Sequence, residues 1–219
     1  MEKPVDISQK KAVTILRILY PLWMVSGIFS IMYVPSALIV QGDAAATAGN
    51  IMSNELLFRS GIAGSLITQL IFIFAALLLY KVFEPVDKTH SLIMVVLALV
   101  SVPIAMLNTL NSIAALMSLK DPGQMLFYLD LNAQGIIIAS IFWGLWLFPL
   151  GYLIYKSGYF PRIIGIAVII GGVGYTLGSF MKLLMPDHGA FLSVLELMTF
   201  GEVIFLGWLV AKGARIPEP

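Results

Sequence analysis

The chain has 219 residues, of which 59% are hydrophobic and 11% charged, and its formal net charge at pH 7 is +1. Soluble domains carry roughly a quarter charged residues, so this composition excludes an ordinary soluble protein and indicates several membrane spans. The near-neutral charge gives no general attraction to nucleic acid, and the absence of cysteine excludes disulfides and thiolate metal sites.

Six apolar segments are each long enough to cross a hydrocarbon core, which requires about 20 helical residues. They lie near residues 14–40, 59–83, 91–119, 133–155, 162–185 and 190–211. The first segment is too long for the core of a cleaved signal peptide, so we expect it to be retained as a helix. The sequence therefore predicts an all-α, polytopic bundle of six transmembrane helices that forms a single transmembrane domain.

Three of these segments contain prolines, at positions 21 and 35 in the first, 103 in the third and 149 in the fourth. Proline removes a backbone hydrogen bond, and membrane bundles accommodate it with a kink because neighbouring groups satisfy the freed carbonyl. We therefore expect kinked rather than interrupted spans.

The basic residues are distributed unequally between the two sides of the predicted bundle. Three belong to one side: Arg59, Lys120 and Lys182. Ten belong to the other: Lys3, Lys10, Lys11, Arg17, Lys81, Lys88, Lys156, Arg162, Lys212 and Arg215. Because cytoplasmic loops are enriched in Lys and Arg, both termini are predicted to lie in the cytoplasm.

The first outer loop has the pattern of a short amphipathic helix. Asp43 is a suitable N-cap for the alanines that follow it. Ile51 and the run from Leu56 to Phe58 supply apolar anchors before the second span. This helix is either a connector packed on the bundle or a lid over an outward-facing cavity. In the next outer loop, Asp130 or Asn132 is predicted to cap the fourth span.

The strongest candidates for a functional role are Glu196 and Glu202, inside the sixth span. An ionised carboxylate in hydrocarbon is costly, so such residues usually face a partner, a cavity or a proton path. A separation of six residues puts the two side chains on different faces of a helix. We therefore expect no carboxylate dyad, and Glu202, near the middle of the span, is the preferred candidate.

Other polar residues are predicted to gather in the outer half of the bundle. Asn108 and Asn111 share a face of the third span, while Arg59 and Lys182 lie near the outer ends of the second and fifth. These residues form either an outward-facing ligand pocket or a structural network, in which Arg59 or Lys182 pairs with Glu196 or Glu202.

Glycines in the fifth span, including a GxxxG spacing between Gly174 and Gly178, indicate close helix packing against a neighbouring span or a second copy. No motif of a hydrolase, metalloprotease or nucleotide-binding protein is present, so catalytic residues remain unassigned. With two histidines, each in a short loop, we expect neither a metal site nor a cofactor.

Several segments together resemble a bacterial family known as domain-of-unknown-function family 4386. They are GDAAATAGNI with NELLFR, YLDLNAQG, GYLIYKSGYFPRIIG and GEVIFLGWLVAKG, in that order. The resemblance implies a multi-span protein of a bacterial cytoplasmic membrane with no assigned activity. By matching position it also selects Arg59 and Glu202.

The leading hypothesis is a non-enzymatic membrane module that binds a small amphiphile, a lipid or a partner subunit in an outward-facing polar pocket. In that role Arg59 would hold an anionic group and Glu202 would supply a buried acceptor or titrating site. Three alternatives remain open: a lipid-modifying or hydrolytic enzyme with Glu202 as acid or base, a proton-coupled transporter, and a purely structural subunit.

Overall fold

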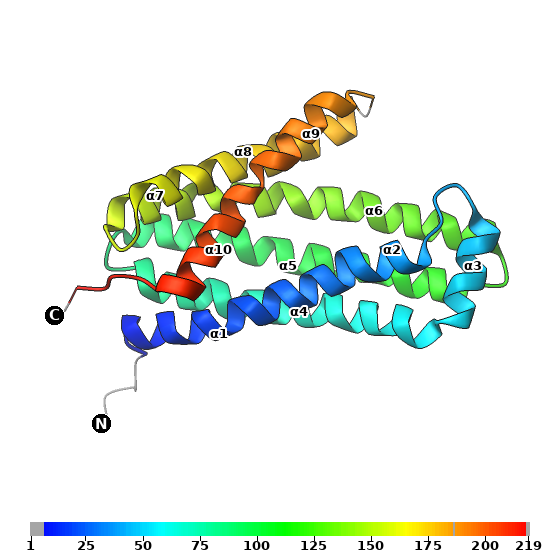
Figure 1. Cartoon of the computed structure of the whole chain (residues 1–219), viewed down its shortest axis with the longest axis horizontal. Helices are drawn as coiled ribbons and strands as arrows, with labels where there is room; N and C mark the ends of the chain where they lie inside the picture. Colours follow the sequence, from blue (N-terminus) through cyan, green and yellow to red (C-terminus); the bar gives the residue numbers. More distant parts are fainter. Residues whose placement is uncertain (1–6, 186, 218–219) are drawn as a thin grey trace. The chain divides into compact units, whose positions relative to one another are not determined.

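The computed structural model describes residues 7–185 and 187–217 as helices joined by short connections, and those residues include no strand (Figure 1). Within them, six helical stretches are long and apolar enough to cross a membrane: Gln9–Leu38, Glu55–Phe83, Lys88–Met117, Pro122–Ser157, Arg162–Leu184 and Gly189–Lys212. The prediction of an all-helical protein with six spans is therefore confirmed. Lys3, a member of the predicted basic side, lies outside the described residues.

Two of the six stretches change helical geometry next to a proline. The first consists of α1 (Gln9–Gly27), a π-helix η1 (Ile28–Tyr33) and α2 (Val34–Leu38), and Pro35 follows the π-helical turns directly. The fourth consists of α6 (Pro122–Leu145) and α7 (Leu147–Ser157), with Pro149 in the first turn of α7. Since proline cannot donate to the carbonyl four residues before it, the regular ladder is lost at these points.

The remaining spans show that proline is neither sufficient nor necessary for a break. The third span is a single helix, α5 (Lys88–Met117), although it contains Pro103. The second and fifth are the continuous helices α4 (Glu55–Phe83) and α8 (Arg162–Leu184). The sixth is divided into α9 (Gly189–Met198) and α10 (Phe200–Lys212) without any proline.

The chain forms two compact units, which are described separately. The first comprises Met1–Pro21, Ile73–Ser101 and Ser140–Pro219, and the second comprises Leu22–Phe72 and Val102–Ala139. The long helices α1, α4, α5 and α6 contribute residues to both units. The organisation as a single transmembrane domain stays a prediction.

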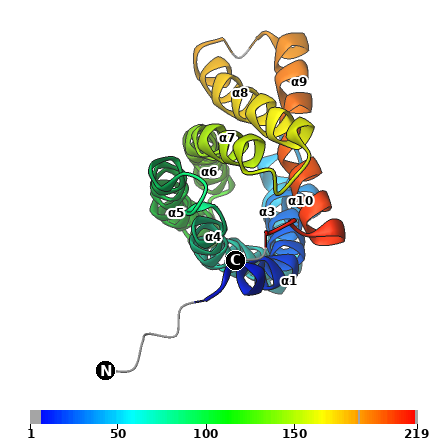
Figure 2. The same ribbon diagram turned by 90° about the vertical axis from the view of Figure 1, so that its left-hand side faces the viewer.

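In the first unit, α8 packs against α7 on one side and against α9 and α10 on another (Figures 1 and 2). The contact between α7 and α8 depends on Gly151 and Gly165. A Cβ atom at Gly151 would lie 2.7 Å from the carbonyl oxygen of Gly165, and one at Gly165 would lie 2.6 Å from that of Gly151. Neither position has room for a side chain, so the two backbones pack directly.

Both described ends of the chain contact Tyr159. The Gln9 side chain donates to the Tyr159 hydroxyl at 3.3 Å, and the backbone N–H of Arg215 donates to the Tyr159 carbonyl at 3.0 Å. The two ends therefore lie on the same side of the first unit, as an even number of spans requires. That this side is cytoplasmic stays a prediction.

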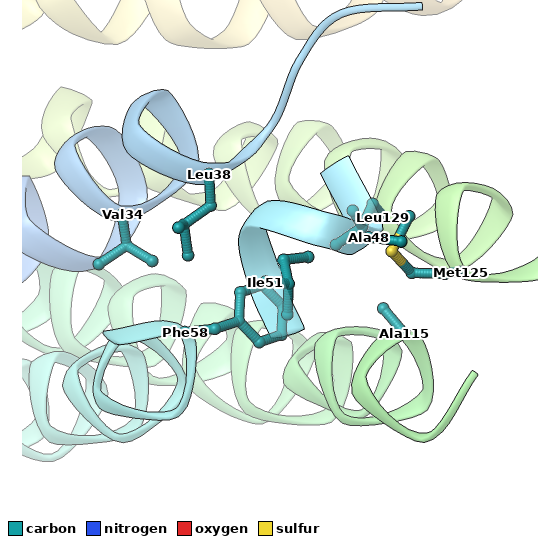
Figure 3. Packing of buried hydrophobic residues seen from close by; sticks show 8 residues of the cluster. All are labelled: Val34, Leu38, Ala48, Ile51, Phe58, Ala115, Met125 and Leu129. Atoms are coloured by element: carbon teal, nitrogen blue, oxygen red, sulfur yellow. The ribbon is translucent and has the colours of Figure 1, made fainter. Parts of the chain in front are cut away.

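In the second unit, the short helix α3 (Ala44–Ser53) is held by a hydrophobic cluster (Figure 3). Its cap is as predicted, with the Ala46 N–H donating to Asp43 at 2.8 Å. Ile51 and Phe58 are buried in the cluster, whereas Leu56 is 81% exposed. The cluster also includes Met125 and Leu129 of α6, so α3 packs on neighbouring helices of its unit as a connector would.

The prediction that Asp130 or Asn132 caps the fourth span is wrong. Helix α6 begins at Pro122, and Asp121 accepts a hydrogen bond from the Gln124 N–H at 3.1 Å. An aspartate followed by proline is a strong helix start, because the carboxylate satisfies a free N–H and proline has none to satisfy. Asp130 and Asn132 thus lie inside the helix.

The connection between α4 and α5 is held by Asp87. Its carboxylate lies 2.9 Å from the Lys156 ammonium and accepts from the His90 N–H at 3.1 Å, which caps the start of α5. The Lys156 ammonium, and then His90, hold the pKa of Asp87 below its usual range. The ionised form of Asp87 is therefore favoured by the fold.

We predict that Asp121→Ala lowers the free energy of unfolding by about 1 kcal/mol, the usual cost of losing an N-cap. Asp130→Ala should be neutral or slightly stabilising, because alanine is the better residue within a helix. Thermal unfolding in mild detergent measures both. Equal destabilisation by the two variants would contradict the assigned start of α6.

The lowered pKa of Asp87 predicts that part of the free energy of unfolding is lost in acid. A carboxyl with a lower pKa in the folded state stabilises the fold above its unfolded-state value, about 3.9, and loses that contribution as the pH falls further. Wild type should therefore lose its advantage over Asp87→Asn progressively as the pH falls from about 4.5 to about 2.5 in thermal unfolding. The loss should still be incomplete at the lower limit, because the folded-state pKa of Asp87 lies well below its usual range. Asp130→Asn is the control, and a constant difference between wild type and Asp87→Asn across this range would refute the assignment.

Candidate functional site

Glu202 is a buried carboxylic acid in the first turn of α10. Its side chain is 7% exposed, and it lies roughly 20 Å along the helix axis from Gly189, near the middle of the sixth span. Acidic side chains at a helix N-terminus interact favourably with the exposed N–H groups of the first turn, by about 0.3–1 kcal/mol. This contribution is small beside the cost of removing a carboxylate from water.

The break before Glu202 is produced by Thr199. Its hydroxyl donates to the Glu196 carbonyl at 2.6 Å, which competes with the helical ladder. The N–H groups of Thr199 and Glu202 donate to carbonyls three residues back, at 3.1 and 3.2 Å. This tighter turn separates α9 from α10 and creates a new helix start two residues before Glu202.

Glycines bring the backbone of α10 against α8 and bury Glu202. A Cβ atom at Gly201 would overlap the carbonyl oxygen of Ala167, and one at Gly171 would lie 3.4 Å from the backbone nitrogen of Glu202. One turn further, a Cβ atom at Gly174 would lie 2.5 Å from the carbonyl oxygen of Leu195 in α9. The glycine-rich face of α8 therefore packs within the chain, on α9 and α10.

Two tyrosines from other helices lie within electrostatic reach of the Glu202 carboxyl. Tyr20 of α1 is 1% exposed, and Tyr175 follows Gly171 by four residues in α8, on the face of that helix that packs against α10. Tyr20 also makes an edge contact with Phe205, with ring centroids 6.4 Å apart. Phe205 packs in turn on Phe160, at 5.4 Å. The carboxyl thus has two phenols nearby and lies beside the aromatic cluster of Tyr20, Phe205 and Phe160.

Within the described residues, the Glu202 side chain has neither an ion pair nor a hydrogen bond. The cations of the first unit that could serve as its partners are engaged elsewhere. The Lys182 ammonium lies 2.8 Å from Glu196, and the Arg17 guanidinium donates to the Val210 carbonyl at 3.0 Å, near the end of α10. Glu202 is therefore buried without a compensating charge from the described residues of its own unit.

The structure brings together only some of the candidates named from the sequence. Lys182 and Glu196 form an ion pair, in which the side chains are 39% and 61% exposed. Arg59 pairs with Glu55, one turn earlier in α4, at 2.7 Å, and its side chain is 58% exposed. Arg59 belongs to the second unit, so its position relative to Glu202 is not described.

Asn108 and Asn111 also belong to the second unit, where they join α5 to α6. Asn108 donates to the Asn132 carbonyl at 2.8 Å, and Asn132 donates back to the Asn108 carbonyl at 3.1 Å. Asn111 donates to the Asn108 side chain at 2.9 Å. Gly135 leaves room for this group, since a Cβ atom there would overlap the Asn108 side chain. These bonds fit a structural clamp between two helices.

Sequence reasoning does not find Tyr20, Tyr175 and Thr199 as neighbours of Glu202. The two tyrosines have the pattern of packing or interface residues, and no local signal distinguishes them from such residues. Thr199 carries a weak signal, because a Thr two residues before a glycine can loosen a helix where close packing is required. No three His, Asp or Glu side chains among the described residues are grouped to hold a metal ion.

Comparison with known proteins gives a family but no activity. A family model described as a domain of unknown function, DUF4386, matches residues 17–213. An uncharacterized protein of Archaeoglobus fulgidus is 30% identical over 159 residues, which cover 72% of this chain and 86% of that protein. No solved structure matches the chain.

The contact between Gly201 and Ala167 predicts the effect of adding one methyl group. Gly201→Ala should lower the free energy of unfolding by about 2 kcal/mol, because backbone atoms must move apart. Gly207→Ala in the same helix is the matched control. No atom lies within 4 Å of the position that a Cβ atom would take there, so it should be neutral or stabilising. Equal melting temperatures in detergent for the two variants would contradict the close packing of α8 and α10.

Proposed function

The chain belongs to the DUF4386 family, and we propose that it is a non-enzymatic membrane protein that binds a small amphiphile through Glu202. A lipid of the surrounding bilayer is one source of such a molecule. The site consists of Glu202 with the hydroxyl groups of Tyr20 and Tyr175. The proposal places the protein, with its multiple spans, in a bacterial cytoplasmic membrane with both termini in the cytoplasm.

The observation that carries the proposal is the uncompensated burial of Glu202. Buried polar groups in proteins are almost always hydrogen-bonded, and buried charges are almost always paired. The exceptions in membrane spans are concentrated at functional sites. A ligand that brings its own polar group to Glu202 would remove the cost of burying the carboxyl, and this gain would contribute to binding.

The surroundings of the carboxyl favour a molecule that is polar at one end and apolar along the rest. Phenol groups donate and accept hydrogen bonds, which suits them to orient the polar end of a ligand. Directly after Glu202, Val203 and Ile204 are 47% and 54% exposed and supply apolar surface. An amphiphile could lay its chain along this surface and reach the carboxyl with its head.

The same geometry weakens the structural alternative. That alternative pairs Lys182 or Arg59 with Glu196 or Glu202. Lys182 does pair with Glu196, whereas Arg59 pairs with Glu55, so the alternative accounts for Glu196 but leaves Glu202 without its expected partner. An enzyme would need a nucleophile or an activated water beside the carboxyl, and the phenols of Tyr20 and Tyr175 are better suited to orienting a ligand. Ligand binding therefore accounts for the buried carboxyl and its neighbouring phenols without requiring a nucleophile, a bound water or another cation.

The proposal predicts that a small molecule remains bound to the purified protein in a Glu202-dependent manner. Wild type, Glu202→Gln and Glu196→Gln would be purified in the same mild detergent and analysed by native mass spectrometry. Glu196→Gln is the matched control, because it removes a carboxylate from the same span that is exposed and already paired. A defined adduct should be present on wild type and Glu196→Gln and absent from Glu202→Gln.

Two results would count against this function. Equal retention of an adduct by all three proteins would remove Glu202 from the binding site. If wild type extracted from its own membrane carries no adduct, the proposal that the protein binds a small amphiphile is wrong.

A further inference from the structure

We infer that the Glu202 site selects amphiphiles with a cationic head group, such as an amine or a quaternary ammonium. The inference rests on the proposed function and specifies its ligand. The charges, aromatic rings and apolar side chains that support it all belong to the first unit.

Among the described residues of the first unit, no cation pairs with Glu202. The Lys182 ammonium is 2.8 Å from Glu196, and the Arg17 guanidinium is held by the Val210 carbonyl at the other end of α10. Neither forms an ion pair with Glu202. A buried carboxyl without a partner is favoured in its neutral form, and an anionic head group would oppose its ionisation further. A cationic head group would supply the missing partner.

Aromatic side chains lie beside the carboxyl. Phe205 follows Glu202 by three residues in α10 and therefore shares its face of the helix, and the Phe205 ring contacts Tyr20 and Phe160. The faces of aromatic rings attract cations by about 0.5–2 kcal/mol, and rings of this kind recognise quaternary ammonium groups in other proteins. A carboxylate beside aromatic rings is therefore a chemical environment suited to an organic cation.

Exposed apolar side chains of α10 offer such a ligand a route to the site from the bilayer. Val203 and Ile204 expose apolar surface on α10 directly after Glu202, and Phe200, two residues before it, is 58% exposed. An alkyl chain in the bilayer can lie along this surface while its head turns toward the carboxyl. A hydrophilic cation without an alkyl chain would lack these contacts and should bind more weakly.

The inference can be tested with three probes that share one alkyl chain and differ in head-group charge. Tetradecyltrimethylammonium, tetradecyl sulfate and tetradecanol would be added at equal mole fraction to the protein in maltoside micelles. The bound fraction would be measured by native mass spectrometry for wild type, Glu202→Gln and Glu196→Gln. The cation should bind wild type and Glu196→Gln at least about tenfold more tightly than Glu202→Gln, because a desolvated charge pair is lost.

The outcomes separate this inference from the function on which it rests. If the sulfate or the alcohol binds as tightly as the cation and also depends on Glu202, the cationic preference is wrong while the amphiphile site remains. If the cation binds wild type and Glu202→Gln equally, it binds elsewhere and the inference fails. If no probe shows binding that depends on Glu202, both the inference and the proposed function fail.

Discussion

The central constraint on this structure is that a carboxyl group in the hydrocarbon region has no water to solvate it. It must be compensated by a cation, by hydrogen-bond donors or by a bound molecule. Glu196 meets this requirement within the chain, since its carboxylate lies 2.8 Å from the Lys182 ammonium. Glu202 does not meet it within the described residues, although it is more deeply buried. The difference between these two acids of one span is the basis for assigning a function to the second.

Several contacts in the first unit fix the position of Glu202. The Thr199 hydroxyl opens the helix before it, and Gly201 and Gly171 let α10 contact α8 closely enough to bury the side chain. At the other end of α10, Arg17 donates to the Val210 carbonyl, and a cation there is favourable for the helix dipole. The helix that carries the carboxyl is thus fixed at both ends, so the acid lies on a rigid element, as a binding site requires.

The sequence was sufficient for the architecture because span length and hydrophobicity determine it almost alone. The cap at Asp43 was also predictable, since it depends only on neighbouring residues. The start of α6 was missed although its signal is local. Asp121 before Pro122 is a strong helix start, but the cap was expected beside the apolar run that begins near residue 133. The partners of the charged residues were least predictable. The ion pairs Arg59–Glu55 and Lys182–Glu196 depend on distances that only the folded backbone sets. The positions of Tyr20 and Tyr175 near Glu202 depend on the folded backbone in the same way.

The stability of Glu202→Met, measured without ligand, tests the account most directly. Methionine has a similar volume, is apolar and leaves no group to compensate. Wild type and variant would be exchanged into maltoside detergent until native mass spectra show no adduct, and their thermal unfolding compared at pH 7. If the carboxyl has no partner within the protein, the variant should melt at the same temperature as wild type or higher. A melting temperature several degrees lower would show that Glu202 is paired inside the fold, which would contradict its assignment as a ligand-binding group.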